Sequence, residues 1–274
     1  MIRRWLILFV GLALFSGCVK KQEEASEKKT YFNKNVFKQS KSFRLIHHMP
    51  YDELKLEKDR LHKEGNDYLA VNFLREMIKK SENPDELRSL RLEYADMLYD
   101  LKQFGEASSE YQLYVQLYPG SDQAPYADYR AIDAENLEVL TADRDQESTQ
   151  KVIDMAKEYG KKIPWRPGYK NYLNDVEKIT HDCLYRLYES EVLRFYFYLN
   201  RQQCKAAYSR LEYIREHYLK YLPEIEANLI ELDYELCCER KQPEGATKKK
   251  DELLKKHPQY KMDSSRRRAY ARII

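Results

Sequence analysis

The chain has 274 residues and a formal net charge of +3, and charged side chains make up 34% of it. This near-neutral balance excludes the strongly basic surface that nucleic-acid binding needs, and a content of only eight glycines favours long solvated helices over sheets. High polarity is typical of disorder, but aromatic residues reach 13%, including 24 tyrosines, and supply large apolar bodies to bury. We therefore predict an ordered, all-α, tyrosine-rich domain.

Residues 1–17 have the order of a secretory signal peptide. A short basic start, Met1–Arg4, precedes an apolar run over Trp5–Phe15. The run is shorter than the roughly 20 apolar residues that span a bilayer. Leu14-Phe15-Ser16-Gly17-Cys18 resembles a lipobox, so we expect cleavage before Cys18 and lipid attachment at that cysteine. Loss of the two leader arginines lowers the net charge from +3 to +1.

Lipid attachment at Cys18 would anchor the domain to the membrane permanently, because several acyl chains together bind a bilayer firmly whereas a single chain binds it only marginally. Val19 stands where inner-membrane retention signals carry Asp, so we expect outer-membrane anchoring with the domain on the periplasmic face. The alternatives are an uncleaved anchor and an ordinary leader in which Cys18 is incidental.

Residues 18–50 are expected to be the lipidated N-terminus and a flexible linker, since they are rich in Lys and Glu without sustained apolar periodicity. Helical periodicity begins at Tyr51 and extends to about residue 261. Within it a frame recurs, consisting of a small residue, large residues one turn on and, in three copies, a proline after the helix. The copies are Ala70, Leu74 and Met77; Ala107, Tyr111, Tyr114 and Pro119; Val152, Ala156, Tyr159 and Pro164; Ala207, Leu211 and Ile214; and Ala246, Leu253 and Pro258.

This frame predicts antiparallel helix pairs, because a small residue lets two helices approach, large residues fill the groove and a proline stops the second helix. Residues 51–261 resemble a right-handed tetratricopeptide-repeat (TPR-like) helical solenoid of about five helix pairs. A polar loop is expected at 141–147, between the helices of the third pair, and a long helix from about Tyr172 to Asn200. Each single copy of the frame also fits an ordinary core face.

Catalytic and metal-binding patterns are not found in the sequence. The six histidines have no metal-ligand spacing, and the four cysteines besides Cys18 lack the paired CxxC spacing of zinc sites. Phosphate loops, nucleophile elbows and the H-E-x-x-H motif are missing too, and Asp143 and Asp145 are better explained as solvated loop acids. We therefore expect no enzyme, no cofactor and no metal.

Several segments are similar to those of one known family of repeat proteins. Residues 65–70, Gly-Asn-Asp-Tyr-Leu-Ala, are similar to the turn of that family's first repeat. Residues 142–146 lie where the family has an Asp/Arg-rich loop, and residues 185–217 are similar to its fourth repeat. The order of leader, lipidated cysteine and five repeats also agrees. The chain therefore resembles the BamD family, the lipoprotein tetratricopeptide subunit of the bacterial β-barrel assembly machinery.

This resemblance implies two kinds of partner: precursor outer-membrane proteins and the barrel-forming subunit with its periplasmic domains. Arg210 falls on a family arginine that forms a salt bridge to that subunit, and Glu212 lies in the same segment. The alternative for Arg210 is a solvated charge. On tetratricopeptide geometry, the concave face would present Leu92, Asp96, Tyr99 and Asp100 to a precursor peptide, although packing between repeats explains the apolar pair equally well.

The same geometry places Cys204 near the adjacent pair Cys237-Cys238, so a disulfide from Cys204 to one of the pair is possible; the alternative is that these cysteines behave as small hydrophobes. Residues 262–274 form a basic tail in which Arg266, Arg267, Arg268 and Arg272 are suited to anionic lipid or an acidic partner, or form a frayed helix end.

Two other functions fit an anchored repeat domain. One is a pilotin-like lipoprotein of a pilus or secretion system. The other is a regulator of peptidoglycan enzymes. The five-repeat length and the region around Arg210 favour the assembly scaffold.

Overall fold

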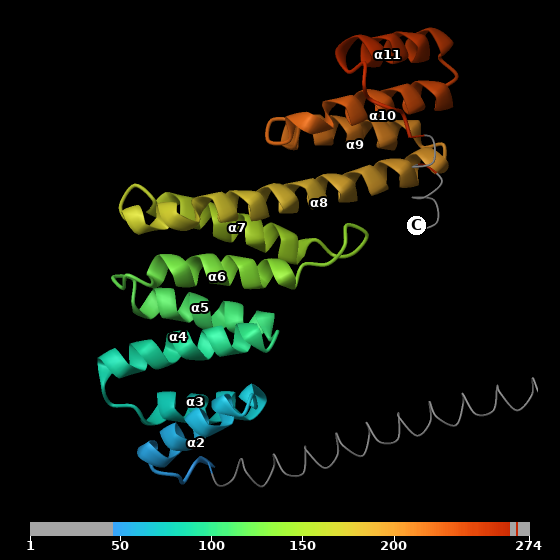
Figure 1. Ribbon diagram of the computed structural model, residues 1–274. Helices are drawn as coiled ribbons and strands as arrows, with labels where there is room; N and C mark the ends of the chain where they lie inside the picture. The colour runs from blue at the N-terminus through green and yellow to red at the C-terminus, as the bar shows by residue number, and fades with distance from the viewer. Residues whose placement is uncertain (1–45, 264–266, 268–274) are drawn as a thin grey trace, which may run out of the picture. The chain divides into compact units, whose positions relative to one another are not determined.

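The structure, a computed structural model, describes residues 46–263 and 267 (Figure 1). This part of the chain is all-helical, with ten α-helices, two short 3₁₀ helices and no strand. It forms two compact units, one ending at Leu90 and the other beginning at Arg91. The expected signal peptide, Cys18 and residues 18–45 of the expected linker lie outside the described residues, as do the tail residues 264–266 and 268–274.

The helices follow one another with short connections. The first unit contains α2 (Tyr51–Lys63) and α3 (Asp67–Lys80), and α4 (Pro84–Asp100) runs from the first unit into the second. The second unit continues with α5 (Phe104–Leu117), α6 (Ala124–Leu137), α7 (Glu147–Lys162), the 3₁₀ helix η1 (Pro167–Tyr172), α8 (Leu173–Asn200), α9 (Cys204–His217), the 3₁₀ helix η2 (Pro223–Ile225), α10 (Glu226–Glu239) and α11 (Pro243–Lys256). From α5 to α11, each α-helix packs on the next (Figure 1).

In the first unit, α2 and α3 pack against each other, and the segment before α2 is bound to α3. Ile46 is buried, His47 Nδ1 lies 2.9 Å from a carboxylate oxygen of buried Glu76, and Lys80 donates to the Met49 carbonyl at 2.6 Å. The last residues of the expected linker thus contact folded chain.

The recurrent frame of the sequence coincides with the second helix of each pair. Its small and large residues lie on α3, α5, α7, α9 and α11, and all of them are at most 8% exposed. Pro119, Pro164 and Pro258 each come two residues after the end of a helix, where the missing N–H of proline removes no helical hydrogen bond. The prediction that these positions are buried on helices is confirmed.

Four helix pairs share one turn geometry. Gly65, Lys102, Gln202 and Lys241 have φ between 57° and 73°, the left-handed region, and each precedes the residue before the second helix. The backbone N–H of the residue after each left-handed position donates to the carbonyl five residues earlier, which closes the turn. Examples are Gln103 to the Leu98 carbonyl and Gln203 to the Tyr198 carbonyl. Only one of the four positions is glycine, the residue that adopts this conformation without strain.

The second unit has two large apolar clusters joined by α8. The first takes buried residues from α6, α7, η1 and the beginning of α8, and the second takes them from the end of α8, α9, η2 and α10. Leu184 and Leu187, in the middle of α8, pack against both clusters. The apolar core is therefore continuous along this 28-residue helix.

Removing the Leu211 side chain tests the second cluster. Leu211 is fully buried on α9, so Leu211→Ala should lower the free energy of unfolding by about 2–5 kcal/mol through lost burial and a cavity. The matched control is Leu254→Ala on α11, which is 55% exposed and should change it by no more than about 0.5 kcal/mol. Urea unfolding followed by far-ultraviolet circular dichroism measures both, and equal effects would contradict this assignment of the core.

Candidate functional site

The carboxylate of Asp96 on α4 accepts hydrogen bonds from two tyrosines. Tyr111 of α5 donates at 2.6 Å and Tyr126 of α6 at 2.9 Å, both to Oδ1. Tyr111 is fully buried, and a buried hydroxyl needs such an acceptor to offset its desolvation. Burial and the nearby carboxylate raise the pKa of Tyr126 to about 12, and that of Tyr111 is raised as well. Asp96, expected to face a peptide, therefore also joins three helices.

Tyr99, one turn further along α4, makes a second tyrosine–carboxylate contact. Its hydroxyl donates to Asp133 of α6 at 2.6 Å, and its ring meets Phe104 edge-on, with 5.2 Å between centroids. Burial and the Asp133 carboxylate raise the pKa of Tyr99 to about 12. The Tyr99 side chain is half-buried.

Arg130 lies between these groups. Its guanidinium carbon is 3.4 Å from the centroid of the Tyr99 ring and 5.9 Å from that of Tyr126, and one of its nitrogens lies 3.4 Å from Asp133. An arginine over an aromatic face is stabilised by the ring quadrupole, most strongly when desolvated. Its Nε is buried and has no hydrogen-bond partner among the described residues.

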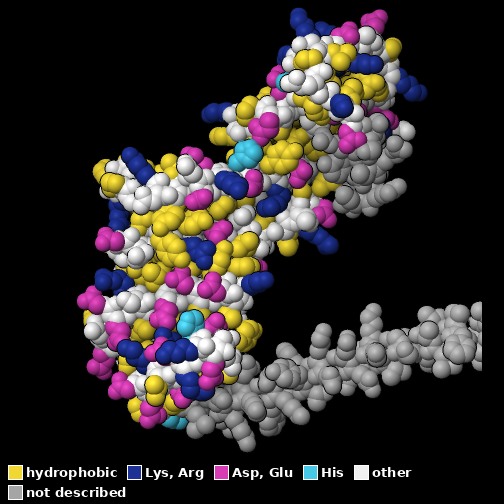
Figure 2. Space-filling model, viewed as in Figure 1, with side chains coloured by type: hydrophobic (Ala, Val, Ile, Leu, Met, Phe, Trp, Pro, Cys, Tyr) yellow, Lys and Arg dark blue, Asp and Glu magenta, His cyan; other side chains and the backbone are white. Residues whose placement is uncertain are grey.

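Two further tyrosines extend this surface toward η1. Tyr129 of α6 stacks on Tyr172 with 5.1 Å between centroids and 7° between planes, and Tyr126 lies 6.1 Å from Tyr172. We call the set Tyr99, Tyr126, Tyr129, Arg130 and Tyr172 the tyrosine surface; all five side chains are half-buried. Figure 2 shows hydrophobic side chains gathered over α6 and the beginning of α8, with a basic side chain among them.

The structure joins two of the four predicted groove residues, Asp96 and Tyr99, in this network. Leu92 is half-buried and Asp100 is exposed, and the network includes neither. Sequence reasoning missed the residues of α6 and η1. The available signal was the spacing of Tyr126, Tyr129 and Arg130, which places three large side chains on one side of a helix.

A separate groove lies along α5 and α7. It has a volume of about 950 Å³, and its lining is mainly polar: Gln112, Val115, Gln116, Asp128, Glu147, Gln150, Lys151, Asp154, Met155, Lys157, Glu158, Lys161 and Lys162. Several lysines are paired with carboxylates, as Lys157 is with Asp154.

The predicted partner residues Arg210 and Glu212 point to different neighbours. Arg210 is half-buried, and its Nη1 lies 3.5 Å from Glu191 of α8, whose side chain is only 7% exposed. Glu212 pairs with Arg215 on its own helix. Positions two apart on a helix do not share a face. The structure therefore does not bring these two residues together.

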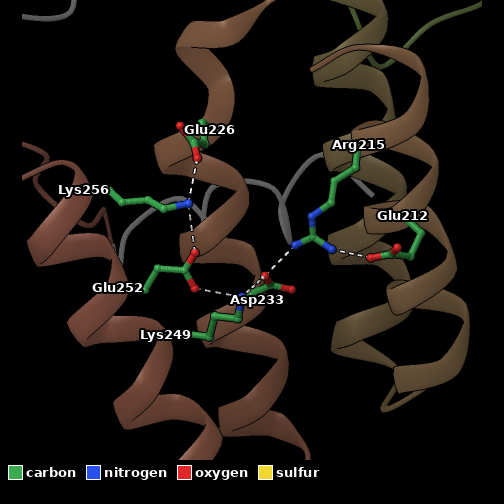
Figure 3. A network of polar contacts seen from close by, with 7 residues as sticks. All are labelled: Glu212, Arg215, Glu226, Asp233, Lys249, Glu252 and Lys256. Atoms are coloured by element: carbon green, nitrogen blue, oxygen red, sulfur yellow. Dashed lines mark hydrogen bonds and ion pairs between the residues drawn. The ribbon is translucent and has the colours of Figure 1, made fainter. Parts of the chain in front are cut away.

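Glu212 belongs to a network of charges that links α9, α10 and α11 (Figure 3). Arg215 contacts buried Asp233 of α10, which also lies 3.0 Å from Lys249 of α11. The chain of contacts continues through Glu252 and Lys256 to Glu226 (Figure 3). Exposed pairs contribute little, but removing both cations from buried Asp233 would leave an uncompensated charge.

Part of the expected tail also contacts α10. The backbone N–H of Asp263 donates to buried Glu231 at 2.7 Å, and Tyr260 donates to the other oxygen at 2.6 Å. Arg267 lies 2.9 Å from Glu239. Arg266, Arg268 and Arg272, which were interpreted either as a contact to lipid or an acidic partner or as a frayed helix end, lie outside the described residues.

The four described cysteines are free thiols, and Cys204 forms no disulfide with Cys237 or Cys238. Cys237 Sγ faces α11, where a Cβ added to Gly245 would lie 3.2 Å from it. Cys204 instead packs against the cluster of α8, α9 and α10, and Cys238 is exposed. Burial raises the pKa of the Cys183 thiol to about 11, which keeps it protonated at neutral pH.

Among residues 46–263 and 267, no group of three or more His, Cys, Asp or Glu side chains is arranged to hold a metal ion. No helix of this part is long and apolar enough to cross a membrane. Comparison with protein-family models and with curated proteins gives no match for the chain.

The tyrosine contacts predict a loss of stability in alkali. Tyr99 and Tyr126 titrate near 12 in the fold, whereas tyrosine in an unfolded chain has a pKa of about 10. Because the folded-state pKa is raised, their stabilisation is complete below a pH of about 10 and is lost as the pH rises through about 12. Urea unfolding over this range should show a falling free energy.

In Tyr99→Phe, which removes one titrating hydroxyl, the free energy of unfolding should decrease less steeply over this pH range. Tyr221→Phe serves as the control, because Tyr221 is 57% exposed and lies outside the tyrosine surface. If Tyr99→Phe and the unaltered chain lose stability with the same slope, Tyr99 is not coupled to folding in this way.

Proposed function

We propose that this chain is an outer-membrane-anchored periplasmic scaffold of the β-barrel assembly machinery, with a TPR-like solenoid that binds precursor outer-membrane proteins and the barrel subunit. Its role is binding and positioning, without catalysis or a cofactor. Lipid attachment at Cys18 would confine this binding to the membrane into which barrels are inserted.

Support for the repeat architecture comes from two features that recur with the helix pairs. The buried small-and-large frame occurs on all five second helices, from α3 to α11. The left-handed residue recurs in the turns of four pairs, and the remaining pair, α6 and α7, has the longer loop that the sequence predicted. Periodic packing of this kind is typical of solenoids, in which each repeat contacts its neighbours.

The observation that carries the proposal is the tyrosine surface. Half-buried tyrosine rings offer a peptide apolar contact area at low entropic cost, and Arg130 adds a positive charge beside them. Precursors of membrane barrels arrive as unfolded chains that alternate apolar and polar residues. Their aromatic and aliphatic side chains suit the rings, and their backbone carbonyls suit the guanidinium.

A separate contact to the barrel subunit is proposed at Arg210. This arginine is half-buried on α9 beside nearly buried Glu191, which holds its position while leaving part of the guanidinium accessible. Arginine is enriched among residues that dominate binding energy at protein interfaces. The two proposed contacts lie on different helices, so variants can separate them.

Affinity purification of the native complex tests this function. The barrel subunit and unfolded precursors should co-purify with the tagged chain. The double variant Tyr129→Ala/Tyr172→Ala should lose about tenfold or more of the precursors while retaining the barrel subunit, since two rings leave the surface. Arg210→Ala should reduce recovery of the barrel subunit instead.

Tyr221→Ala is the matched control for the rings, because Tyr221 is exposed and lies outside the tyrosine surface. Circular dichroism of each purified variant checks that the helices remain folded. Recovery of a secretin or a murein synthase without any barrel protein would contradict the proposal and favour a pilotin or a peptidoglycan-enzyme regulator.

A further inference from the structure

Trp165, in the turn between α7 and η1, is the most exposed large hydrophobic side chain of the described chain, at 85%. Its neighbours Pro164 and Pro167 are exposed as well. Tryptophan is rarely left in water to this extent, because its large apolar area is among the most favourable to bury. Such exposure indicates a contact with something outside the chain.

The turn that presents Trp165 is held in place. The N–H groups of Trp165 and Arg166 both donate to the Lys162 carbonyl at 3.1 Å. The Arg166 guanidinium donates to the Ser121 carbonyl at 2.9 Å, which fixes the turn to the connection before α6. Buried Tyr169 then anchors the beginning of η1. The indole is thus displayed by an ordered backbone, which lowers the entropic cost of binding.

The same segment carries only positive charge. Residues 159–174 contain Lys161, Lys162, Arg166 and Lys170 and no Asp or Glu. Glu158 and Asp128 pair with the first two lysines, and Lys170 is exposed. Two exposed acids adjoin the segment, Asp122 in the turn before α6 and Asp175 near the beginning of α8. Of the four cations, Arg166 and Lys170 are the two that form no ion pair among the described residues, and Arg166 donates to the Ser121 carbonyl.

We propose that the turn from Lys161 to Lys170 contacts the headgroup region of an anionic phospholipid membrane, with the Trp165 indole in the interface and the basic side chains beside the lipid phosphates. Tryptophan prefers this region because its apolar body and polar N–H meet both environments. Lysine and arginine gain free energy near anionic lipid.

Charge favours a lipid surface over a pocket on a protein. The core of a protein interface is depleted of charged residues, whereas the surface of a leaflet that contains anionic lipid is negative and attracts basic side chains. A run of sixteen residues without a single acid matches the second kind of surface. The inference rests on the proposed membrane anchorage in one respect: a tether at Cys18 raises the local concentration, so a weak second contact suffices to orient the domain.

Trp165 also reports its own environment. The chain contains two tryptophans, Trp5 and Trp165, and the first leaves with the signal peptide. The experiment uses the mature chain with Cys18→Ala, which removes the anchor, and vesicles of phosphatidylglycerol and phosphatidylethanolamine at millimolar lipid. The emission should shift to the blue and be quenched by brominated acyl chains, with little response to phosphatidylcholine vesicles.

Vesicle sedimentation extends the test to variants. Trp165→Ala should weaken association about tenfold. Lys170→Glu should weaken it at least about fivefold. Lys255→Glu, at an exposed lysine on α11, is the matched control and should leave it unchanged.

The proposal is overturned if the emission stays that of a water-exposed indole at every lipid concentration. It is also overturned if Trp165 becomes shielded only on addition of purified periplasmic domains of a barrel subunit, which would make the turn a protein contact. Failure with vesicles leaves the scaffold function standing when barrel protein still co-purifies. Conversely, a vesicle response without barrel protein in the native complex refutes that function alone.

Discussion

The second unit depends on α8, because the two halves of this helix are buried in different cores. Val176, Ile179 and Cys183 pack with α6 and α7, while Phe195, Tyr196 and Leu199 pack with α9 and α10. Leu184 and Leu187 contact both cores. A helix is stiff over this length, so its two ends hold a fixed spacing. The tyrosine surface near its beginning and Arg210 on the helix after it are thereby placed by one element.

Tyrosine fills these cores only where its hydroxyl finds an acceptor. Tyr159 donates to the Tyr169 carbonyl at 2.8 Å, and Tyr188 donates to the side chain of buried Asn228. Tyr111 uses Asp96 in the same way. Each contact couples an apolar ring to a polar group on another part of the fold, which specifies helix register more tightly than aliphatic packing does. Tyrosines therefore supply both part of the buried core and the half-buried rings of the tyrosine surface.

Local patterns predicted much of this fold. The Ala and bulky-residue frame identified the buried side of five helices, and the loop near 141–147 and the start of the long α8 were close to their observed positions. The helix before this loop, α6, ends at Leu137. Such features follow from residues close in sequence, which is why a single chain reveals them.

Long-range contacts were less predictable. The residue types at positions 102, 202 and 241 do not predict a left-handed backbone. Lys102, Gln202 and Lys241 are held in that conformation by the helices on either side. The tyrosine surface likewise depends on which face of α6 meets α4 and η1, and that pairing brings Arg130 onto Tyr99. Asp96 and Tyr99 could be predicted as site residues because they lie on the same face of one helix. Their hydrogen-bond partners lie up to 34 residues away in the sequence and could not be predicted in this way.

The central claim is that the tyrosine surface binds extended precursor segments. Amide hydrogen exchange, measured with and without an unfolded outer-membrane protein segment, tests it directly. Binding should slow exchange around Tyr99 in α4, around Tyr129 in α6 and in η1, where backbone opening would break contacts to the bound peptide. Protection confined to the groove along α5 and α7, or no protection at all, would contradict the account.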